Sequence, residues 1–138
     1  MSAAIEALLA QARALRTAGQ ADAAATAYRN AATLARTEDA PLGLAHALRH
    51  VSDLAREAGR DDEALATGSE ALALYRAQAT PLPLDLANAL RVTALALDLN
   101  DQHDAAVSLW REARGLYAGL GISAGVAECE QHLPRRAT

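Results

Sequence analysis

Two histidines and an aspartate are the side chains whose types and spacing come nearest to a reactive site. His46 and His50 stand four residues apart and Asp53 follows three residues later, so on one helix all three share a face. Imidazoles at this spacing can hold a zinc or nickel ion together, with a carboxylate as the third ligand. The corresponding residues about 40 positions later complete no ligand shell: Asn88, Val92 and Leu95. We therefore interpret the histidines as polar surface residues and predict no metal site and no cofactor.

The remaining sequence contains no pattern typical of catalysis. Its single cysteine, Cys129, excludes an internal disulfide and fits a reducing compartment. No base motif surrounds it, so we predict a buried, unreactive thiol. The glycines form no phosphate-binding loop, and no G-x-S-x-G signature links a serine to a histidine. We expect a protein that is not an enzyme.

Composition and charge narrow the class of protein further. The net charge of −4 lacks the basic footprint of proteins that bind nucleic acid. Neither a secretory signal nor an apolar run of about 20 residues is present, which predicts a soluble, cytoplasmic protein without membrane contact. The sequence contains arginine but no lysine, and alanine dominates the apolar share, as in proteins of GC-rich bacterial genomes. Alanine favours helices, and its small side chain lets helix backbones pack closely.

An internal repeat with a period of about 40–42 residues defines the elements that must position these side chains. One register comprises three polar turns and places Asp22, Asp62 and Asp104 at nearly equal intervals. A second register aligns the segments GLAHALRH, DLANALRV and GVAECEQH, which begin at positions 43, 85 and 125. A third register places Tyr75 and Tyr117 one such interval apart. Three registers with one period indicate a repeat architecture.

Each unit is predicted to form two helices, because apolar residues recur at helical spacing on either side of a polar turn. The first helices are expected at about 3–18, 41–58 and 84–99, and the second helices at about 22–36, 62–77 and 103–118. Proline-marked links join the units, with Asp39 and Thr80 as the expected N-caps. We predict an all-α fold and a single domain over residues 1–138. Its repeats cover about 3–38, 39–79 and 80–120.

A shorter helix is expected at about 122–132, after the third unit. It carries Glu130 where the second and third units have Leu48 and Leu90. A final helix with a polar outer surface covers the apolar end of a repeat stack. We therefore predict a C-terminal capping helix and expect the chain to be complete.

The pattern resembles tetratricopeptide repeats, in a longer form of about 40–42 residues, over nearly the whole chain. The resemblance depends on a leucine and a small residue in each first helix, and on two alanines with a large residue between them in each second helix. These residues are Leu8, Leu48 and Leu90; Ala12, Ser52 and Ala94; Ala24, Ala64 and Ala106; Tyr28 and Trp110; and Ala31, Ala71 and Ala113. Gly68 replaces the large residue in the middle unit, which predicts a thin spot in the core, and Asp101 replaces a turn glycine.

The resemblance implies a right-handed superhelical stack of antiparallel helix pairs, in which the first helices line a concave groove that holds a peptide. Transferred by register, the groove residues are Glu6, Leu9, Arg13, Arg16, His46, Arg49, Asp53, Arg56, Asn88, Arg91, Leu95 and Asp98. The planar fork of arginine suits carboxylates, so we predict an acidic or carboxylate-bearing peptide centred on Arg49 and Arg91. The family's clamp for chaperone tails is not transferred, because Leu9 and Arg13 stand where it needs lysine and asparagine.

The sequence thus predicts a protein–protein interaction module that binds a peptide or partner protein in this groove. The alternative is a self-associating scaffold, a homodimer formed through an end face or the convex side, and a small-molecule sensor is a third option. Tyr75 and Tyr117 bear on this choice. Their equivalent places near the ends of second helices indicate packing between repeats, whereas exposure of both on one side would favour an interface.

Overall fold

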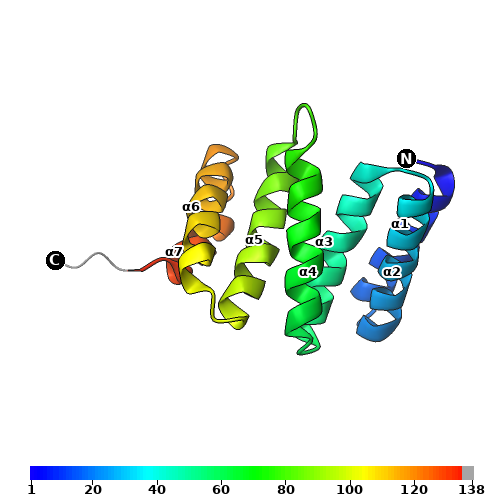
Figure 1. Cartoon of the computed structure of the whole chain (residues 1–138), viewed down its shortest axis with the longest axis horizontal. Helices are drawn as coiled ribbons and strands as arrows, with labels where there is room; N and C mark the ends of the chain where they lie inside the picture. Colours follow the sequence, from blue (N-terminus) through cyan, green and yellow to red (C-terminus); the bar gives the residue numbers. More distant parts are fainter. Residues whose placement is uncertain (135–138) are drawn as a thin grey trace.

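The computed structural model describes residues 1–134, and every regular element in this part of the chain is an α-helix (Figure 1). The helices are α1 (Ala3–Thr17), α2 (Ala21–Thr37), α3 (Pro41–Glu57), α4 (Asp61–Arg76), α5 (Pro83–Leu99), α6 (His103–Gly119) and α7 (Ser123–His132). Each bound lies within about one residue of the sequence prediction, so the all-α prediction with its helices is confirmed over the described residues. None of the helices in this range is both long and apolar enough to cross a membrane.

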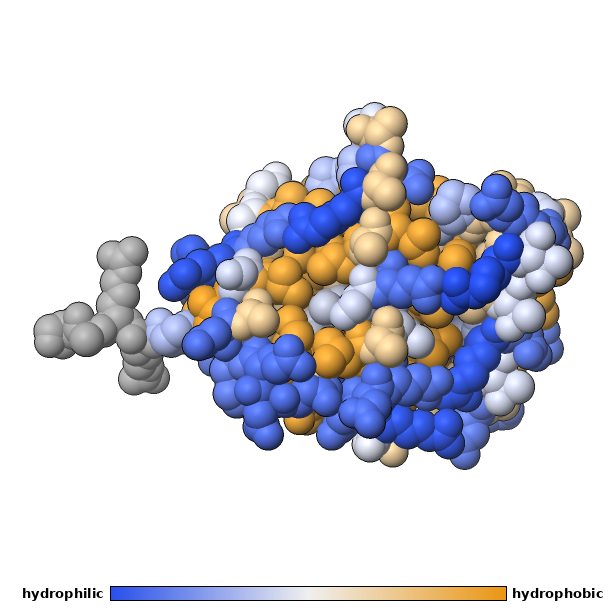
Figure 2. Space-filling view, in the orientation of Figure 1, coloured by the Kyte–Doolittle hydropathy of each residue, from blue (hydrophilic) through white to orange (hydrophobic). Residues whose placement is uncertain are grey.

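The helices follow one another along the long axis of the molecule, from α1 and α2 at one end to α6 and α7 at the other (Figure 1). Every helix packs against the next one in the chain, and α3 also contacts α1 and α5, so the odd-numbered helices lie next to one another. Ion pairs join neighbouring even-numbered helices: Arg29 with Glu63, Arg36 with Glu70, and Arg76 with Glu112. In the same view, Figure 2 shows hydrophilic bands separated by hydrophobic areas.

Five tight turns between helices contain a residue with a positive φ: Gly19, Asp39, Gly59, Asp101 and Gly121. After each of them a backbone N–H donates to the carbonyl five residues back, as Ala40 does to Ala35 at 2.8 Å, which is the Schellman pattern of helix ends. The prediction that Asp39 caps α3 is therefore wrong. Asp39 has φ 51° and ends α2, a conformation that aspartate tolerates better than most residues. Thr80 is not a cap either, because α5 begins after Leu82.

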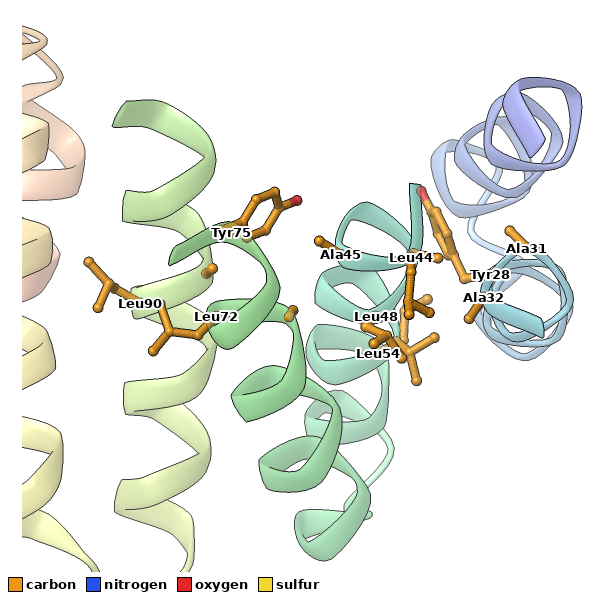
Figure 3. Packing of buried hydrophobic residues seen from close by; sticks show 14 of the residues in the cluster. Tyr28, Ala31, Ala32, Leu44, Ala45, Leu48, Leu54, Leu72, Tyr75 and Leu90 are labelled. Atoms are coloured by element: carbon orange, nitrogen blue, oxygen red, sulfur yellow. The ribbon is translucent and has the colours of Figure 1, made fainter. Parts of the chain in front are cut away.

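Alanine side chains fill much of the space between the helices, and a few large side chains are buried among them (Figure 3). Trp110, Tyr28 and Tyr75 are the largest fully buried residues of the described chain. Tyr75 and Tyr117 are only 1% and 3% exposed. The two tyrosines therefore pack in the interior, as their equivalent positions predicted, and form no exposed patch.

Gly68 lies where α4 packs closely against α3 and α5. A Cβ atom at this position would lie 2.8 Å from Ser52 Oγ on α3 and 3.4 Å from the Cα atom of Thr93 on α5. Ser52 is fixed there because its hydroxyl donates to the carbonyl of Ala64 at 2.7 Å. The expected thin spot is therefore absent: three helices close around the glycine, and no space is left for a larger residue.

Candidate functional site

Three adjoining pockets run along the odd-numbered helices and form one groove. The first, the α1–α3 pocket, has a volume of about 480 Å³; a central pocket of about 160 Å³ and an α5–α7 pocket of about 460 Å³ follow. Arg49 and His50 line both of the first two pockets, and Asn88 and Arg91 line both of the last two. We call this continuous surface the odd-helix groove. A separate pocket of about 290 Å³, near the start of α2, shares no lining residue with it.

The groove brings together most of the side chains that the register placed there. The lining includes Glu6, Leu9, Arg13, Arg16, His46, Arg49, Asp53, Asn88 and Arg91. Three predicted residues do not line it. Arg56 lies against Asp53 at 2.7 Å, and Leu95 packs against the core. Asp98 accepts a hydrogen bond from the indole of Trp110 at 3.0 Å, a contact that directs it toward α6.

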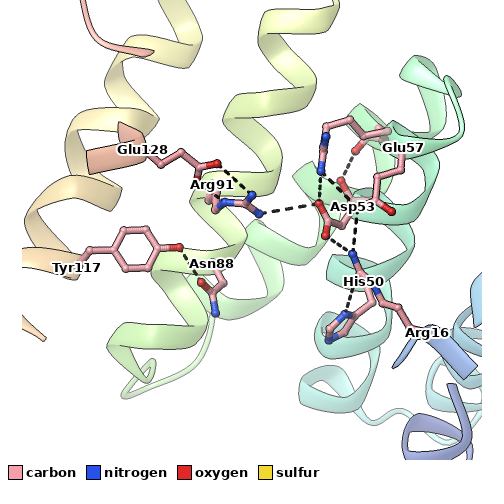
Figure 4. Close-up of polar contacts among 11 residues, drawn as sticks. Arg16, His50, Asp53, Glu57, Asn88, Arg91, Tyr117 and Glu128 are labelled. Carbon is pink, nitrogen blue, oxygen red and sulfur yellow. Dashed lines mark hydrogen bonds and ion pairs between the residues drawn. The ribbon is translucent and has the colours of Figure 1, made fainter. Parts of the chain in front are cut away.

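Asp53 accepts hydrogen bonds from two arginines and lies within ion-pair distance of a third, Arg91 (Figure 4). Arg16 donates to one carboxylate oxygen, Arg56 donates to the other at 2.7 Å, and Arg91 lies 3.9 Å from it. Burial alone would raise the pKa of Asp53, but the hydrogen bonds from Arg56 and Arg16 outweigh it and hold the pKa below its ordinary value. Because Arg16 belongs to α1 and Arg91 to α5, this one carboxylate on α3 links three odd-numbered helices.

His50 is held between an aromatic ring and a cation. Its ring stacks on that of Tyr28, with centroids 4.5 Å apart and planes 8° apart. Arg16 lies 3.2 Å from Nδ1 of His50, and since a guanidinium can only donate, Nδ1 accepts and the ring proton is on Nε2. Burial, together with the nearby cations Arg49 and Arg16, lowers the pKa of His50 to about 3. His50 is therefore uncharged at neutral pH.

His46 is bonded to the hydroxyl of Tyr75, which lies 2.6 Å from its Nδ1 atom. Arg49 Nε donates to the same hydroxyl oxygen at 3.4 Å. Burial lowers the pKa of His46, although Asp85 partly offsets the effect. The two histidines are thus engaged in separate contacts, and within residues 1–134 no three potential ligands are grouped as a metal ion would require.

The α5–α7 pocket contains residues that the register could have identified. Arg91 donates to both carboxylate oxygens of Glu128, and these bonds raise the pKa of Arg91. Glu128 has the same register as His46 and Asn88, so extending the groove assignment into the capping helix would have included it. The hydroxyl of Tyr117 donates to the Asn88 side chain at 2.6 Å, and burial raises the pKa of Tyr117 to about 12. The register identifies Glu128 as a groove residue, but its bond with Arg91 depends on α5 and α7 being neighbours.

Two arginines of the groove, Arg13 and Arg49, form no ion pair with a carboxylate of the described chain. Arg13 is exposed on α1, and Arg49 is half-buried on α3. Both line the α1–α3 pocket. Their charges therefore face the pocket without the neutralisation that Arg16, Arg56 and Arg91 receive.

Cys129 has no exposed surface in the described structure. Burial, and the charge of neighbouring Glu128, raise the pKa of its thiol. A raised pKa disfavours the thiolate, which is the reactive form. The prediction of a buried thiol is confirmed.

The groove offers hydrogen-bond donors from its arginines and from the neutral ring of His50, and acceptors from Glu6, Asp53 and Glu128. A lining of this kind can hold an extended polar chain through several separate contacts. Comparison of the chain with protein-family models and with curated proteins finds no match.

Proposed function

We propose that this chain is a tetratricopeptide-like repeat protein, with three helix pairs and the capping helix α7 wound into a right-handed superhelix. The support is that equivalent positions make equivalent contacts. Tyr75 bonds His46 and Tyr117 bonds Asn88, in both cases across 29 residues. The aromatic rings repeat as well: Tyr28 stacks on His50, and Trp110 stacks on His132 with centroids 4.2 Å apart. On this proposal the odd-numbered helices form the concave side.

The function that we propose is the binding of a peptide or partner protein in the odd-helix groove, in the cytoplasm of a bacterium and without catalysis. The observation that carries this proposal is the continuity of the groove. Its three pockets extend from α1 to α7 and share Arg49, His50, Asn88 and Arg91 as common walls. An extended chain fits such a surface better than a small molecule does, because the volume is spread along the helices instead of being enclosed.

Two tryptophan substitutions test this function. Ala10 lines the α1–α3 pocket and Ala124 lines the α5–α7 pocket, and both are exposed. Ala10→Trp and Ala124→Trp should fill the groove without disturbing the core, and each should lower partner affinity at least tenfold. The matched control is Ala73→Trp, at an exposed position on α4 outside these pockets. The measurement is affinity capture from the native host with all four proteins, followed by titration calorimetry with the captured partner. A partner retained by both groove variants would refute the proposal.

Self-association is the second candidate, and exposed side chains at one edge favour it. Met1, Leu42, Leu82, Leu84 and Leu120 are between 37% and 65% exposed. Each lies at or just before the start of an odd-numbered helix, so consecutive antiparallel packing puts all of them at one edge of the molecule. Light scattering over a range of concentrations tests this candidate. A dimer that Leu82→Asp dissociates would support it, and a monomer at all concentrations would rule it out.

A further inference from the structure

Two arginines at equivalent positions of consecutive repeats differ in whether they form an ion pair with the next odd-numbered helix. Arg49 on α3 and Arg91 on α5 occupy the same position in consecutive repeats. Arg91 donates to both carboxylate oxygens of Glu128 on α7, the next odd-numbered helix. For Arg49 the next odd-numbered helix is α5, and the residue in the register of Glu128 there is Asn88. A neutral amide therefore stands where a carboxylate would neutralise Arg49.

Asn88 cannot fully replace that carboxylate. Its side-chain oxygen already accepts the hydroxyl proton of Tyr117 at 2.6 Å. The hydrogen bond that Arg49 makes at 3.4 Å reaches the hydroxyl of Tyr75, which is also neutral. A half-buried cation without a counter-ion gains more from an added anion than a cation that is already paired. An anion from outside the chain is therefore favoured at Arg49 over Arg91.

The α1–α3 pocket, which Arg49 lines, suits such an anion. Its volume of about 480 Å³ is many times the roughly 30 Å³ that one water occupies in the liquid. Arg13 contributes a second unpaired guanidinium from α1, and the neutral ring of His50 contributes an N–H donor without charge. Glu6 is the one carboxylate among the lining residues described, and it forms no ion pair with either arginine there.

The geometry points to an anion subsite in the α1–α3 pocket that binds a carboxylate side chain of an acidic peptide between Arg49 and Arg13. This inference rests on the proposed binding function and names the chemistry of the ligand. It moves the centre of acid recognition away from the pair Arg49 and Arg91 that the sequence predicted, because Glu128 already neutralises Arg91. The ligand thus supplies to Arg49 the acceptor that Asn88 lacks.

Labelled hexaglutamate and hexaglutamine peptides test the subsite by fluorescence anisotropy. Hexaglutamate should bind the unmodified protein, and hexaglutamine should bind at least tenfold more weakly. Arg49→Ala and Arg13→Ala should each reduce hexaglutamate affinity about tenfold or more, since a charge-assisted bond is lost. Arg111→Ala is the matched control, because Arg111 is an exposed arginine that lines none of the three groove pockets and has no ion pair within residues 1–134. An equal loss in Arg111→Ala would show general charge attraction and overturn the inference.

A second pair of variants tests the missing acceptor itself. Asn88→Glu places on α5 a carboxylate equivalent to that of Glu128 on α7. Asn88→Gln introduces a side chain of the same shape without the charge. Asn88→Glu should bind hexaglutamate at least tenfold more weakly than Asn88→Gln, because the new carboxylate occupies Arg49. Glu128→Gln should act in the opposite direction by releasing Arg91. Circular dichroism verifies that each variant is folded.

The two proposals fail in different ways. If the native partner depends on the groove in the tryptophan test but hexaglutamate and hexaglutamine bind equally, the groove function stands and the anion subsite is refuted. Equal hexaglutamate affinity for Asn88→Glu and Asn88→Gln also refutes the subsite. If hexaglutamate binding requires Arg49 but the partner is retained by both tryptophan variants, the anion subsite stands and the groove is not the partner surface.

Discussion

The polar side chains of the groove keep one another in defined charge states. His50 is the clearest case, because its ring faces Tyr28 from α2, Arg16 from α1, and Arg49 and Asp53 from its own helix. A proton on Nδ1 would remove the acceptor that Arg16 uses and would add a third positive charge to this cluster. Burial and these cations together account for a pKa of about 3, well below the ordinary 6.5.

We predict that the protein loses stability as the pH falls from about 6.5 toward 3, the interval between the ordinary and the folded pKa of His50. In this interval the unfolded chain takes up a proton that the folded chain does not, so the free energy of unfolding falls by at most about 1.4 kcal/mol per pH unit for this group. The lowered pKa of His46 acts in the same direction. Urea denaturation at several pH values measures the slope.

The control for this pH dependence is His50→Gln, which removes one titrating group and should reduce the slope between pH 6.5 and 4, leaving the part that His46 contributes. Only slopes are compared, because the substitution also removes the stacking contact with Tyr28. A free energy of unfolding that stays constant from pH 7 to pH 5 would contradict the assignment of a neutral, buried His50.

At the scale of the helices, two helical glycines differ in how much space surrounds them. Gly68 on α4 lies where a Cβ atom would approach Ser52 Oγ to 2.8 Å, and that hydroxyl is held by its bond to Ala64. Gly115 on α6 has no atom within 4 Å of the same hypothetical Cβ. Both glycines are in helices, so alanine is the better helix former at both by about 1 kcal/mol. Only the surroundings distinguish them.

We therefore predict opposite effects for two identical substitutions. Gly68→Ala should destabilise the protein by about 1–3 kcal/mol, because overpacking at a three-helix contact exceeds the gain in helix propensity. Gly115→Ala should stabilise it by about 0.5–1 kcal/mol. Denaturant unfolding measures both changes. A stabilising Gly68→Ala would mean that the helices can separate there, and would restore the thin core that the sequence suggested.

The helices were predictable because they depend on local information, namely the spacing of apolar residues and the polar turns. Gly68 and Asp39 were misjudged because their roles depend on what comes near them or on the backbone angle, and neither is visible in a periodic pattern. Asp39 is a residue type that caps helices, yet its φ of 51° makes it part of a helix end instead. Composition alone does not distinguish these two uses of aspartate.

The groove was predictable as far as the repeat register determines which way a side chain points from its helix. Positions shared by the first helices do line one surface, but Asp98 leaves it because Trp110 is close enough to donate to it at 3.0 Å. The charge balance could not be predicted, because it depends on pairs between helices. Asp53 bonds Arg16 and Arg56, while Arg49 four residues earlier on the same helix has no carboxylate partner in the described chain.

For the whole molecule, α7 is the last described helix, and its burial differs from that of α3 and α5. On α3 and α5, Ala45 and Ala87 are 1% and 0% exposed, because each is covered by a neighbouring helix. Ala127 has the same register on α7 and is exposed. Glu130, in the register of two buried leucines, is exposed and pairs with Arg114 at 3.0 Å. One side of α7 therefore packs on the preceding helices, while Ala127 and Glu130 on its other side are exposed.

Because one side of α7 packs on the preceding helices, its removal should expose residues that it now covers. Removing the chain from Gly121 onward should uncover Tyr117, whose ring lies so close to α7 that a Cβ at Gly125 would be 2.5 Å from its Cγ atom. It also removes the stacking of His132 on Trp110 and the acceptor Glu128 from Arg91. We expect the melting temperature to fall by about 10 °C or more, which corresponds to a few kcal/mol, and the protein to aggregate.

The control keeps α7 and changes only its outer side. Ala127→Glu should leave the melting temperature nearly unchanged, because the new side chain extends into solvent. The same substitution at the equivalent Ala45, which is 1% exposed, should prevent folding, because it buries an unpaired charge between helices. Differential scanning calorimetry and light scattering compare the three proteins. A truncated chain that remains monomeric with the same melting temperature would show that α7 does not protect the end, and the equal tolerance of glutamate at both positions would show that the helices do not pack by register.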